Sequence, residues 1–244
     1  MEINGNAYTL FDLGRSSEYL SLGDLLPYVE EINNRNGLIS DFENAVQNVN
    51  EFKTKSFNSI FEFRNFRILI YCIIRATSPK TVIETGVLHG MTSAFMLEAL
   101  SRNESGNLYS IDLPSYPNQG PANKDGFDAV LPPGKEPGWM VPERLKSRWE
   151  LIIGKSLEKL PDLISKVKTV DLFLHDSEHT YDTMWKEMGY AWEALSDKGV
   201  LICDNVDNNT SFFDFCNKTQ KFPVMFGGQG NEIASKIRFG IISK

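Results

Sequence analysis

Polar residues that could hold a metal ion follow two apolar runs in the second half of the chain. Asp176 comes directly after the run 170–175, and Asp204-Asn205 comes directly after the run 199–203. Because neighbouring parallel strands lie about 4.8 Å apart, their carboxyl ends would bring these side chains toward one point. Two carboxylates and an amide oxygen are hard ligands that suit Mg²⁺, Ca²⁺ or Mn²⁺. The pattern therefore predicts a site for Mg²⁺ or another divalent cation.

A histidine close to Asp176 could accept a proton. His179 follows in the string HDSEHTY. Its unperturbed pKa of about 6.5 suits a general base. A bound cation could hold a substrate hydroxyl and lower its pKa. A histidine is therefore a suitable residue type for a base at this position.

The same residues have structural alternatives. Asp176 could cap the helix predicted over 181–195, although Thr180 could cap it instead. Asp204 and Asn205 could simply be turn residues. The sequence leaves both alternatives open.

A glycine-containing turn earlier in the chain has the features of a cofactor site. Residues 82–84 predict a short strand, residues 91–100 predict a helix, and Gly86 and Gly90 lie between them. Glycine permits a sharp turn and a close approach of the backbone to a ligand. In open α/β sheets, ligands bind beyond the carboxyl ends of the strands, where this turn lies.

Three further residues would complete a nucleotide-like site. Thr92 and Ser93 offer hydroxyls beside the free N–H groups of a helix start, where a carboxylate is stabilised. Asp112 ends the next predicted strand, where an acid can accept hydrogen bonds from both ribose hydroxyls. Leu88 stands where a dinucleotide motif requires its second glycine, which disfavours a dinucleotide. The structural alternative is that the glycines only form a turn and Asp112 caps a loop.

The elements that must position these residues alternate between strand and helix from Thr81 onward. The helix over 181–195 carries Trp185, Met188 and Trp192 at helical spacing, which predicts a core-facing stripe. The predicted strands are 82–84, 107–112, 151–153, 170–175, 199–203, 222–226 and 237–242. Repeated strand–helix–strand units predict an α/β fold with a doubly wound, mostly parallel, seven-stranded Rossmann-like sheet.

The chain before this pattern is expected to be helical. Residues 1–78 show no strand alternation, and Asp24, Asp41 and Ser56 precede apolar residues at helical spacing, as helix-start residues do. We expect 1–78 to form an N-terminal helical extension and 79–244 to form the catalytic domain.

A Pro- and Gly-rich insertion, residues 114–148, separates the second and third predicted strands. A loop of this length in a compact domain predicts a lid-like segment, with disorder as the alternative. Trp139 and Met140 favour the lid, because a disordered loop would not need them.

Composition limits the partners and the location. The chain has 244 residues, a net charge of −7 and no Lys/Arg-rich run, so we expect a small-molecule acceptor and no nucleic acid. The longest apolar run is far shorter than the roughly 20 residues that span a membrane. The N-terminus lacks signal-peptide features, and Cys72, Cys203 and Cys216 are scattered, which favours reduced thiols in the cytoplasm.

The string ETGVLHGMTSA resembles the class I S-adenosylmethionine-dependent methyltransferases, whose usual pattern is E/D-x-G-x-G-x-G, here with the middle glycine replaced. The resemblance implies that Glu84, Gly86 and Gly90 surround the methionine part of S-adenosylmethionine and that Asp112 binds its ribose. It also implies that Ser156 contacts adenine, although Ser156 could instead cap the helix that follows.

The metal-site residues carry a second resemblance. An aspartate after one strand and Asp-Asn after the next resemble the catechol O-methyltransferase type of metal site. The D-x-x-H-x-Y string that begins at Asp176 is similar to that of bacterial O-methyltransferases acting on macrolide sugars. These resemblances cover about residues 80–242. They imply that Asp176, Asp204 and Asn205 bind the metal. They also imply that Asp176 and His179 are the catalytic residues, with His179 as the general base.

The resemblances together imply a metal-assisted O-methyltransferase acting on a hydroxyl of a sugar or small secondary metabolite. Three alternatives stay open: a metal-independent N- or O-methyltransferase, a non-catalytic S-adenosylmethionine-binding protein, and an NAD-dependent oxidoreductase. A homodimer through the N-terminal helices is also expected, from their apolar residues Phe57, Ile60, Phe61, Phe63 and Phe66.

Overall fold

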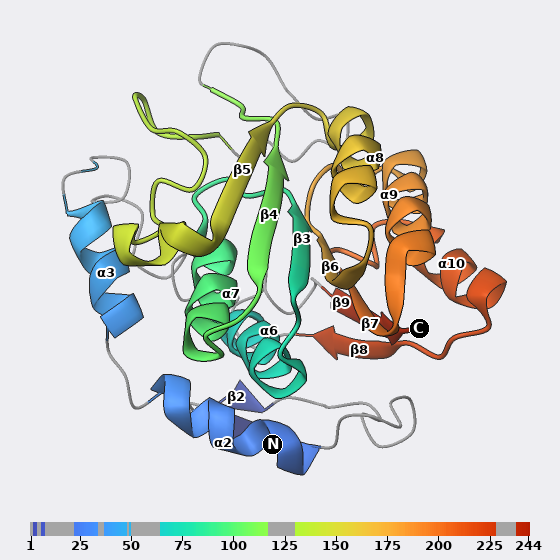
Figure 1. Cartoon of the computed structure of the whole chain (residues 1–244), viewed down its shortest axis with the longest axis horizontal. Coiled ribbons are helices and arrows are strands. Elements are labelled where there is room, and N and C mark those ends of the chain that lie inside the picture. Colours follow the sequence, from blue (N-terminus) through green and yellow to red (C-terminus); the bar gives the residue numbers. More distant parts are fainter. Residues whose placement is uncertain are drawn as a thin grey trace.

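The computed structural model shows a central sheet covered by helices on both faces (Figure 1). It describes residues 2–3, 6–7, 22–33, 37–47, 49, 64–116, 130–227 and 238–244. None of the helices in these ranges is long and apolar enough to cross a membrane.

The sheet has seven strands in the order β5-β4-β3-β6-β7-β9-β8. Their bounds are β3 Thr81–Thr85, β4 Asn107–Asp112, β5 Trp149–Ile153, β6 Val170–His175, β7 Leu195–Cys203, β8 Val224–Gly227 and β9 Arg238–Ser243. The first five strands in this order run parallel, and β9 pairs antiparallel with both β7 and β8. This confirms the expected doubly wound fold. The strand order reverses between β3 and β6, which is where such sheets bind ligands.

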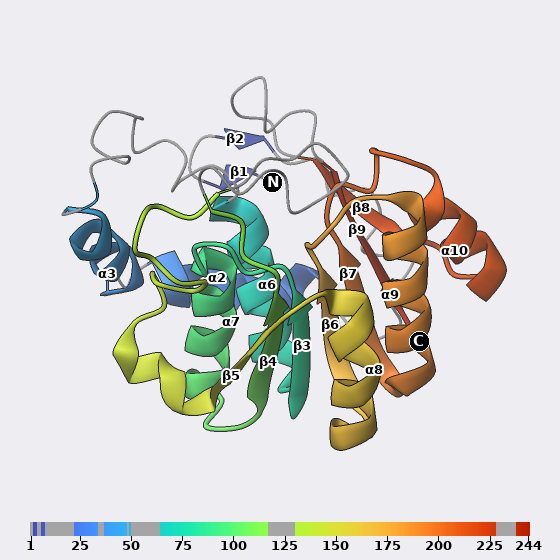
Figure 2. The ribbon, with the colours of Figure 1, turned by 90° about the horizontal axis from the view of Figure 1, so that it is seen from above.

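Two hydrophobic clusters hold the helices against the sheet. The helices α6 (Arg64–Thr77) and α7 (Met91–Arg102) cover one face, and α8 (Ser156–Val167), α9 (Tyr181–Ala194) and α10 (Ser211–Thr219) cover the other (Figure 2). The stripe predicted on α9 is in the core. Met188 is buried, while Trp185 and Trp192 each meet Phe215 edge to face.

The N-terminal region is helical in α2 (Leu22–Asn33) and α3 (Gly37–Val46), but it also contains strands. The strands β1 (Glu2–Ile3) and β2 (Asn6–Ala7) pair antiparallel, so the expectation of no strand there is wrong. Strands of two residues are too short to show an alternating pattern.

Of the predicted helix starts within the described residues, Asp24 lies at the beginning of a helix and Asp41 does not. Asp24 lies in the first turn of α2, where an acid favours the helix dipole, whereas Asp41 lies inside α3 and pairs with Arg144 at 3.0 Å. Ser56 lies outside the described residues. The last helix of this region, α6, ends at Thr77, just before Ser78-Pro79.

One residue of the expected dimer surface packs inside the molecule. Phe66 is buried and stacks on Phe239, so this residue packs inside one molecule. Phe57, Ile60, Phe61 and Phe63 lie outside the described residues. The homodimer therefore stays a prediction, which a sedimentation measurement would test.

The second half of the 114–148 insertion is packed rather than loose. Leu131, Met140, Val141 and Leu145 are all buried, and the segment ends in the short 3-10 helix η1 (Glu143–Arg148). Residues 117–129 lie outside the described part. Over 130–148, the alternative of a disordered loop is therefore wrong.

The helix α3 packs against α7 of the sheet domain. Because of this packing, Phe42→Ala should strongly reduce the thermal stability of the protein. Phe42 is fully buried and its ring lies 6.2 Å from the ring of Phe95 on α7. Losing a buried phenylalanine costs about 3–5 kcal/mol, so the midpoint of thermal unfolding should fall by roughly 10 °C. Leu26→Ala is the matched control, because Leu26 on α2 is 47% exposed and should cost less than about 1 kcal/mol. Equal effects would contradict a docked extension.

Candidate cofactor site and metal centre

The turn after β3 lies directly against the end of β6. Gly86 has φ +84°, and its N–H donates to the carbonyl of Ile111 at 2.8 Å. A Cβ on Gly86 would stand 1.8 Å from the carbonyl oxygen of Asp176. Glycine is therefore required here both by the backbone conformation and by the space available.

Asp112 ends β4 as predicted and holds this turn. Its Oδ2 accepts hydrogen bonds from the backbone N–H groups of Val87 at 2.6 Å and Leu88 at 2.9 Å. Burial raises the pKa of Asp112, and the two amides partly offset that rise. The carboxylate thus has a structural role in the described chain, and its predicted contact with a ribose stays a prediction.

Leu88, which stands in place of the middle glycine of the usual pattern, adopts a backbone conformation that favours glycine. It has φ +48°, in the left-handed region. A non-glycine residue loses about 1–2 kcal/mol there. The neighbouring chain fixes the conformation, because the carbonyl of Leu88 accepts from Gly138 N–H at 2.8 Å.

Residues 138–141 of the insertion, which we call the strap, cover the start of α7. A Cβ on Gly90 would lie 2.6 Å from the Cα of Gly138. Met140 N–H donates to the carbonyl of His89 at 3.0 Å, and Trp139 Nε1–H donates to His89 Nδ1 at 2.9 Å. Burial lowers the pKa of His89 to about 4, so the ring is neutral.

Glu84 lies beneath the turn rather than on its open side. It is 1% exposed, and its Oε2 accepts from the hydroxyls of Ser93 at 2.6 Å and Ser110 at 2.8 Å. Burial raises its pKa to about 7, although both hydroxyls act in the opposite sense. The Ser93 hydroxyl is therefore directed at Glu84. Thr92, one residue earlier, accepts at Oγ1 from Arg67 Nε at 3.3 Å.

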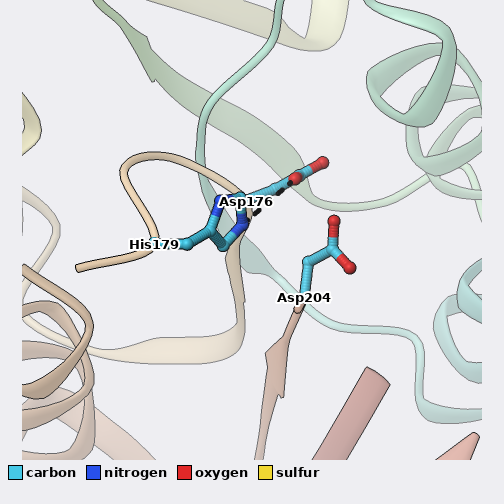
Figure 3. Close-up of side chains that lie close together, drawn as sticks. All are labelled: Asp176, His179 and Asp204. Atoms are coloured by element: carbon cyan, nitrogen blue, oxygen red, sulfur yellow. Dashed lines mark ion pairs between the residues drawn. The ribbon is translucent and has the colours of Figure 1, made fainter. Parts of the chain in front are cut away.

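The predicted metal residues converge at the ends of β6 and β7. One ligand atom each from Asp176, His179 and Asp204 lies within 4.8 Å of the others (Figure 3). His179 Nε2 is 3.9 Å from Asp176 Oδ1. The backbone N–H of Asp176 donates to Thr85, and that of Asp204 donates to His175, which keeps the strand ends together.

Asn205 lies in the same cluster. Its Nδ2 is 3.2 Å from His179 Nε2 and 3.4 Å from Asp204 Oδ2. The three ligands expected from the sequence are thus brought together, and the histidine expected as a base lies among them. An imidazole suits transition metals such as Zn²⁺ or Fe²⁺ better than Mg²⁺ or Ca²⁺, so His179 is a further candidate ligand for an ion of that kind.

The electrostatics of this cluster fit a cation. Burial and the nearby charge of Asp204 raise the pKa of Asp176, and burial raises the pKa of Asp204 to about 6. Because 32% of the Asp176 side chain is exposed, water moderates its rise. Two adjacent acids resist joint ionisation, and a divalent ion would remove that resistance.

The structural alternative for Asp176 is wrong. The N-cap of α9 is Thr180, whose Oγ1 accepts from the N–H of Thr183 at 3.4 Å. Asn205 does begin a turn, since Asn208 N–H donates to the carbonyl of Asn205 at 3.0 Å, and Asp204 directly precedes that turn. Asn205 is therefore both a turn residue and a member of the cluster.

The alternative for Ser156 is also wrong, because Ser156 is the first residue of α8 and Lys155 is the N-cap. The Ser156 hydroxyl contributes to lowering the pKa of Glu187, so it faces the interior of the α8–α9 layer. Contact with adenine stays a prediction.

A buried polar network that sequence reasoning missed lies behind the cluster. Glu187 on α9 is 0% exposed and accepts from Thr85 at 2.6 Å and Ser177 at 2.7 Å. Its Oε2 also lies 2.7 Å from Nδ1 of His175, the last residue of β6. The signal in the sequence is an acid on the apolar face of a helix, one residue before the buried Met188. Such a residue is usually paired.

These observations define a class of protein. A doubly wound sheet with a glycine turn after β3, an acid at the end of β4 and an acidic cluster after β6 and β7 is the architecture of a Rossmann-like cofactor-dependent enzyme. The sequence model of a methyltransferase domain matches residues 83–206, just over half of the chain. The chain belongs to this family, and the expected S-adenosylmethionine-dependent methyltransferase is confirmed.

Solved structures share the fold at low sequence identity. An O-methyltransferase from Bacillus cereus, in complex with SAH, is 14% identical with a TM-score of 0.59, and the match covers 89% of this chain and 96% of that one. The methyltransferase PaMTH1 of Podospora anserina is 13% identical with a TM-score of 0.53 and coverages of 93% and 99%. The O-methyltransferase TomG of Streptomyces achromogenes is 13% identical with a TM-score of 0.53, and the match covers 84% of this chain and 96% of that one. A search of curated proteins finds no match.

The buried network around Glu187 predicts that the folding stability falls in acid. The variant Glu187→Gln should be less stable at neutral pH and should show less of this pH dependence. Burial alone would raise the pKa of Glu187, but His175, Ser156 and Thr85 outweigh it and lower that pKa below 4.5. The unfolded chain therefore binds more protons in this range, and stability is lost as the pH falls below about 4.5. The variant should lose about 2–3 kcal/mol at pH 7 and show a shallower pH dependence in urea unfolding. Glu158→Gln, on the exposed side of α8, is the control; parallel curves for wild type and Glu187→Gln would refute the assignment.

Proposed function

We propose that this chain is a divalent-cation-assisted O-methyltransferase that acts on a hydroxyl of a sugar or small secondary metabolite. The observation that carries the proposal is the convergence of Asp176, His179 and Asp204 at the sheet edge, next to the turn that contains Gly86. The names of two fold relatives, the Bacillus cereus and Streptomyces achromogenes proteins, support transfer to oxygen.

In this proposal the cofactor lies along the carboxyl ends of β3, β4 and β5. The methionine part lies against the turn of Glu84, Gly86 and Gly90, with Thr92 and Ser93 near its carboxylate. The ribose lies at Asp112, and the adenine lies near Ser156. The left-handed Leu88 and the strap support this placement, because they give the turn one fixed shape.

The acceptor lies at the acidic cluster. Asp176, Asp204 and Asn205 would hold the cation, which supplies a lowered pKa for the acceptor hydroxyl. S-adenosylmethionine, when bound, would supply the methyl group to the acceptor oxygen, with its carbon–sulfur bond broken and S-adenosylhomocysteine released. Nε2 of His179 would take the hydroxyl proton. The protein mainly aligns oxygen, carbon and sulfur, and alignment of this kind can supply several kcal/mol.

If a divalent cation assists the reaction, removing it with a chelator should abolish methyl transfer, and so should the substitution Asp204→Asn. We expect at least about a 100-fold loss of kcat for Asp204→Asn, and recovery of the chelated wild type by added Mg²⁺. Methyl transfer from labelled cofactor onto a panel of sugar and phenol hydroxyls measures this. Asp207→Asn is the matched control, because Asp207 is an exposed acid in the same loop. Full activity after chelation would favour the metal-independent methyltransferase.

The role of His179 is tested separately, because one Nε2 atom cannot bind the ion and take the proton together. As a base, His179→Ala should lose about 10²- to 10⁴-fold in kcat while Mg²⁺ affinity stays within about threefold. Added imidazole should restore part of the rate. Glu178→Gln in the same loop is the control. A fall in Mg²⁺ affinity, with the rate restored by excess Mg²⁺, would instead make His179 a ligand.

The division into residues 1–78 and 79–244 and the cytoplasmic location stay predictions. A protein that binds S-adenosylmethionine but turns over no acceptor, and is indifferent to His179→Ala, would favour the non-catalytic alternative.

A further inference from the structure

Glu187 lies on the apolar face of α9, where an uncharged side chain would fit the surroundings. Met184, Met188 and Ala191 share that face of the helix and are buried in the core, and Glu187 is itself fully buried. Replacing a buried ion pair by apolar residues of similar volume is often neutral or even stabilising. Stability alone therefore gives little reason for an acid at this position.

The carboxylate of Glu187 is bonded to the residues on both sides of Asp176. Its Oε1 accepts from the hydroxyl of Ser177 at 2.7 Å, and its Oε2 lies 2.7 Å from Nδ1 of His175. The pKa of Glu187 is lowered, and an ionised carboxylate can only accept, so Nδ1 of His175 is the donor. One side chain on α9 thus holds the main chain directly before and directly after a proposed cation ligand.

A third bond joins the same carboxylate to the end of β3. Thr85 Oγ1 donates to Oε2 of Glu187 at 2.6 Å, and the carbonyl of Thr85 accepts from the N–H of Asp176 at 2.8 Å. On the far side of Thr85, a Cβ on Gly86 would stand 1.8 Å from the carbonyl oxygen of Asp176. The main chain of Asp176 is therefore fixed from β3 by its own backbone and from α9 by Glu187.

The side chain of Asp176 needs such support because of its neighbour. Asp176 begins the loop between β6 and α9, and ligand atoms of Asp176 and Asp204 lie within 4.8 Å of each other (Figure 3). Two carboxylates at this separation repel when both are ionised, which favours movement of the loop away from β7. Hydrogen bonds to Ser177 and His175 oppose that movement and keep the ligand atoms in place before an ion arrives.

We propose that Glu187 is a positioning residue for the cation site: by bonding Ser177 and His175, it holds Asp176 where it can bind a divalent ion together with Asp204. The inference rests on the proposed function, because it assumes that the acidic cluster binds such an ion. Replacing partners that orient metal ligands typically changes metal affinity by about 10- to 100-fold.

The test measures Mn²⁺ binding to the purified protein, since the electron paramagnetic resonance signal of the free ion falls as the ion binds. Ser177→Ala removes the bond next to Asp176 and leaves the pair of His175 and Glu187 intact. It should weaken Mn²⁺ binding by roughly 10-fold. Glu187→Gln can no longer accept at both oxygens and should weaken it by roughly 10- to 100-fold. All affinities are measured well below the midpoint of thermal unfolding, on folded protein.

Thr85→Val is the matched control. It removes a hydrogen bond of similar length from the same carboxylate, but on the side of β3, and it keeps the backbone bond between residue 85 and Asp176. The midpoint of thermal unfolding should fall at least as far as in Ser177→Ala, while the Mn²⁺ affinity stays within about twofold of wild type. Should Glu187→Gln not fold, Ser177→Ala and Thr85→Val carry the comparison.

Two results would overturn this inference alone. Unchanged Mn²⁺ affinity in Ser177→Ala and Glu187→Gln, with a loss of thermal stability only, would make the network purely structural. An equal loss of Mn²⁺ affinity in Thr85→Val would mean that any damage to the network has the same effect. A wild type that binds no Mn²⁺ is a distinct result, because the cation part of the proposed function would then fail and this inference with it.

Discussion

The contact between the turn after β3 and the end of β6 governs the rest of this site. Gly86 lies so close to the carbonyl of Asp176 that no side chain fits between them. The contact lies where the strand order reverses, so it joins the cofactor half of the edge to the acidic half. A methyl donor bound by one half would then face an acceptor bound by the other, with little freedom for misalignment.

Charge is arranged around that contact in layers. The acids Asp176 and Asp204 lie at the edge, Arg67 adds positive charge from α6, and the pair of His175 and Glu187 lies underneath. Glu187 of this pair also accepts hydrogen bonds from Thr85 and Ser177, so it ties the ends of β3 and β6 to α9.

Sequence patterns were sufficient for the sheet and for the residues that end its strands. β4 and β6 have the predicted bounds, 107–112 and 170–175, and an acid ends β4 and directly follows β6 and β7. Contacts between segments far apart in the sequence could not be predicted from these patterns. The approach of His179 to the carboxylates depends on how the loop before α9 folds, and the left-handed Leu88 depends on Gly138. Local propensity carries no information about either.

The strap makes the turn after β3 depend on a segment of the chain that is synthesised later. Its hydrogen bonds to Leu88 and His89 join segments some fifty residues apart, and a Cβ on Gly138 would meet the ring of Trp149 on β5. Until residues 138–140 have been synthesised and have packed against β5, the turn lacks the two backbone hydrogen bonds that Gly138 and Met140 donate to it.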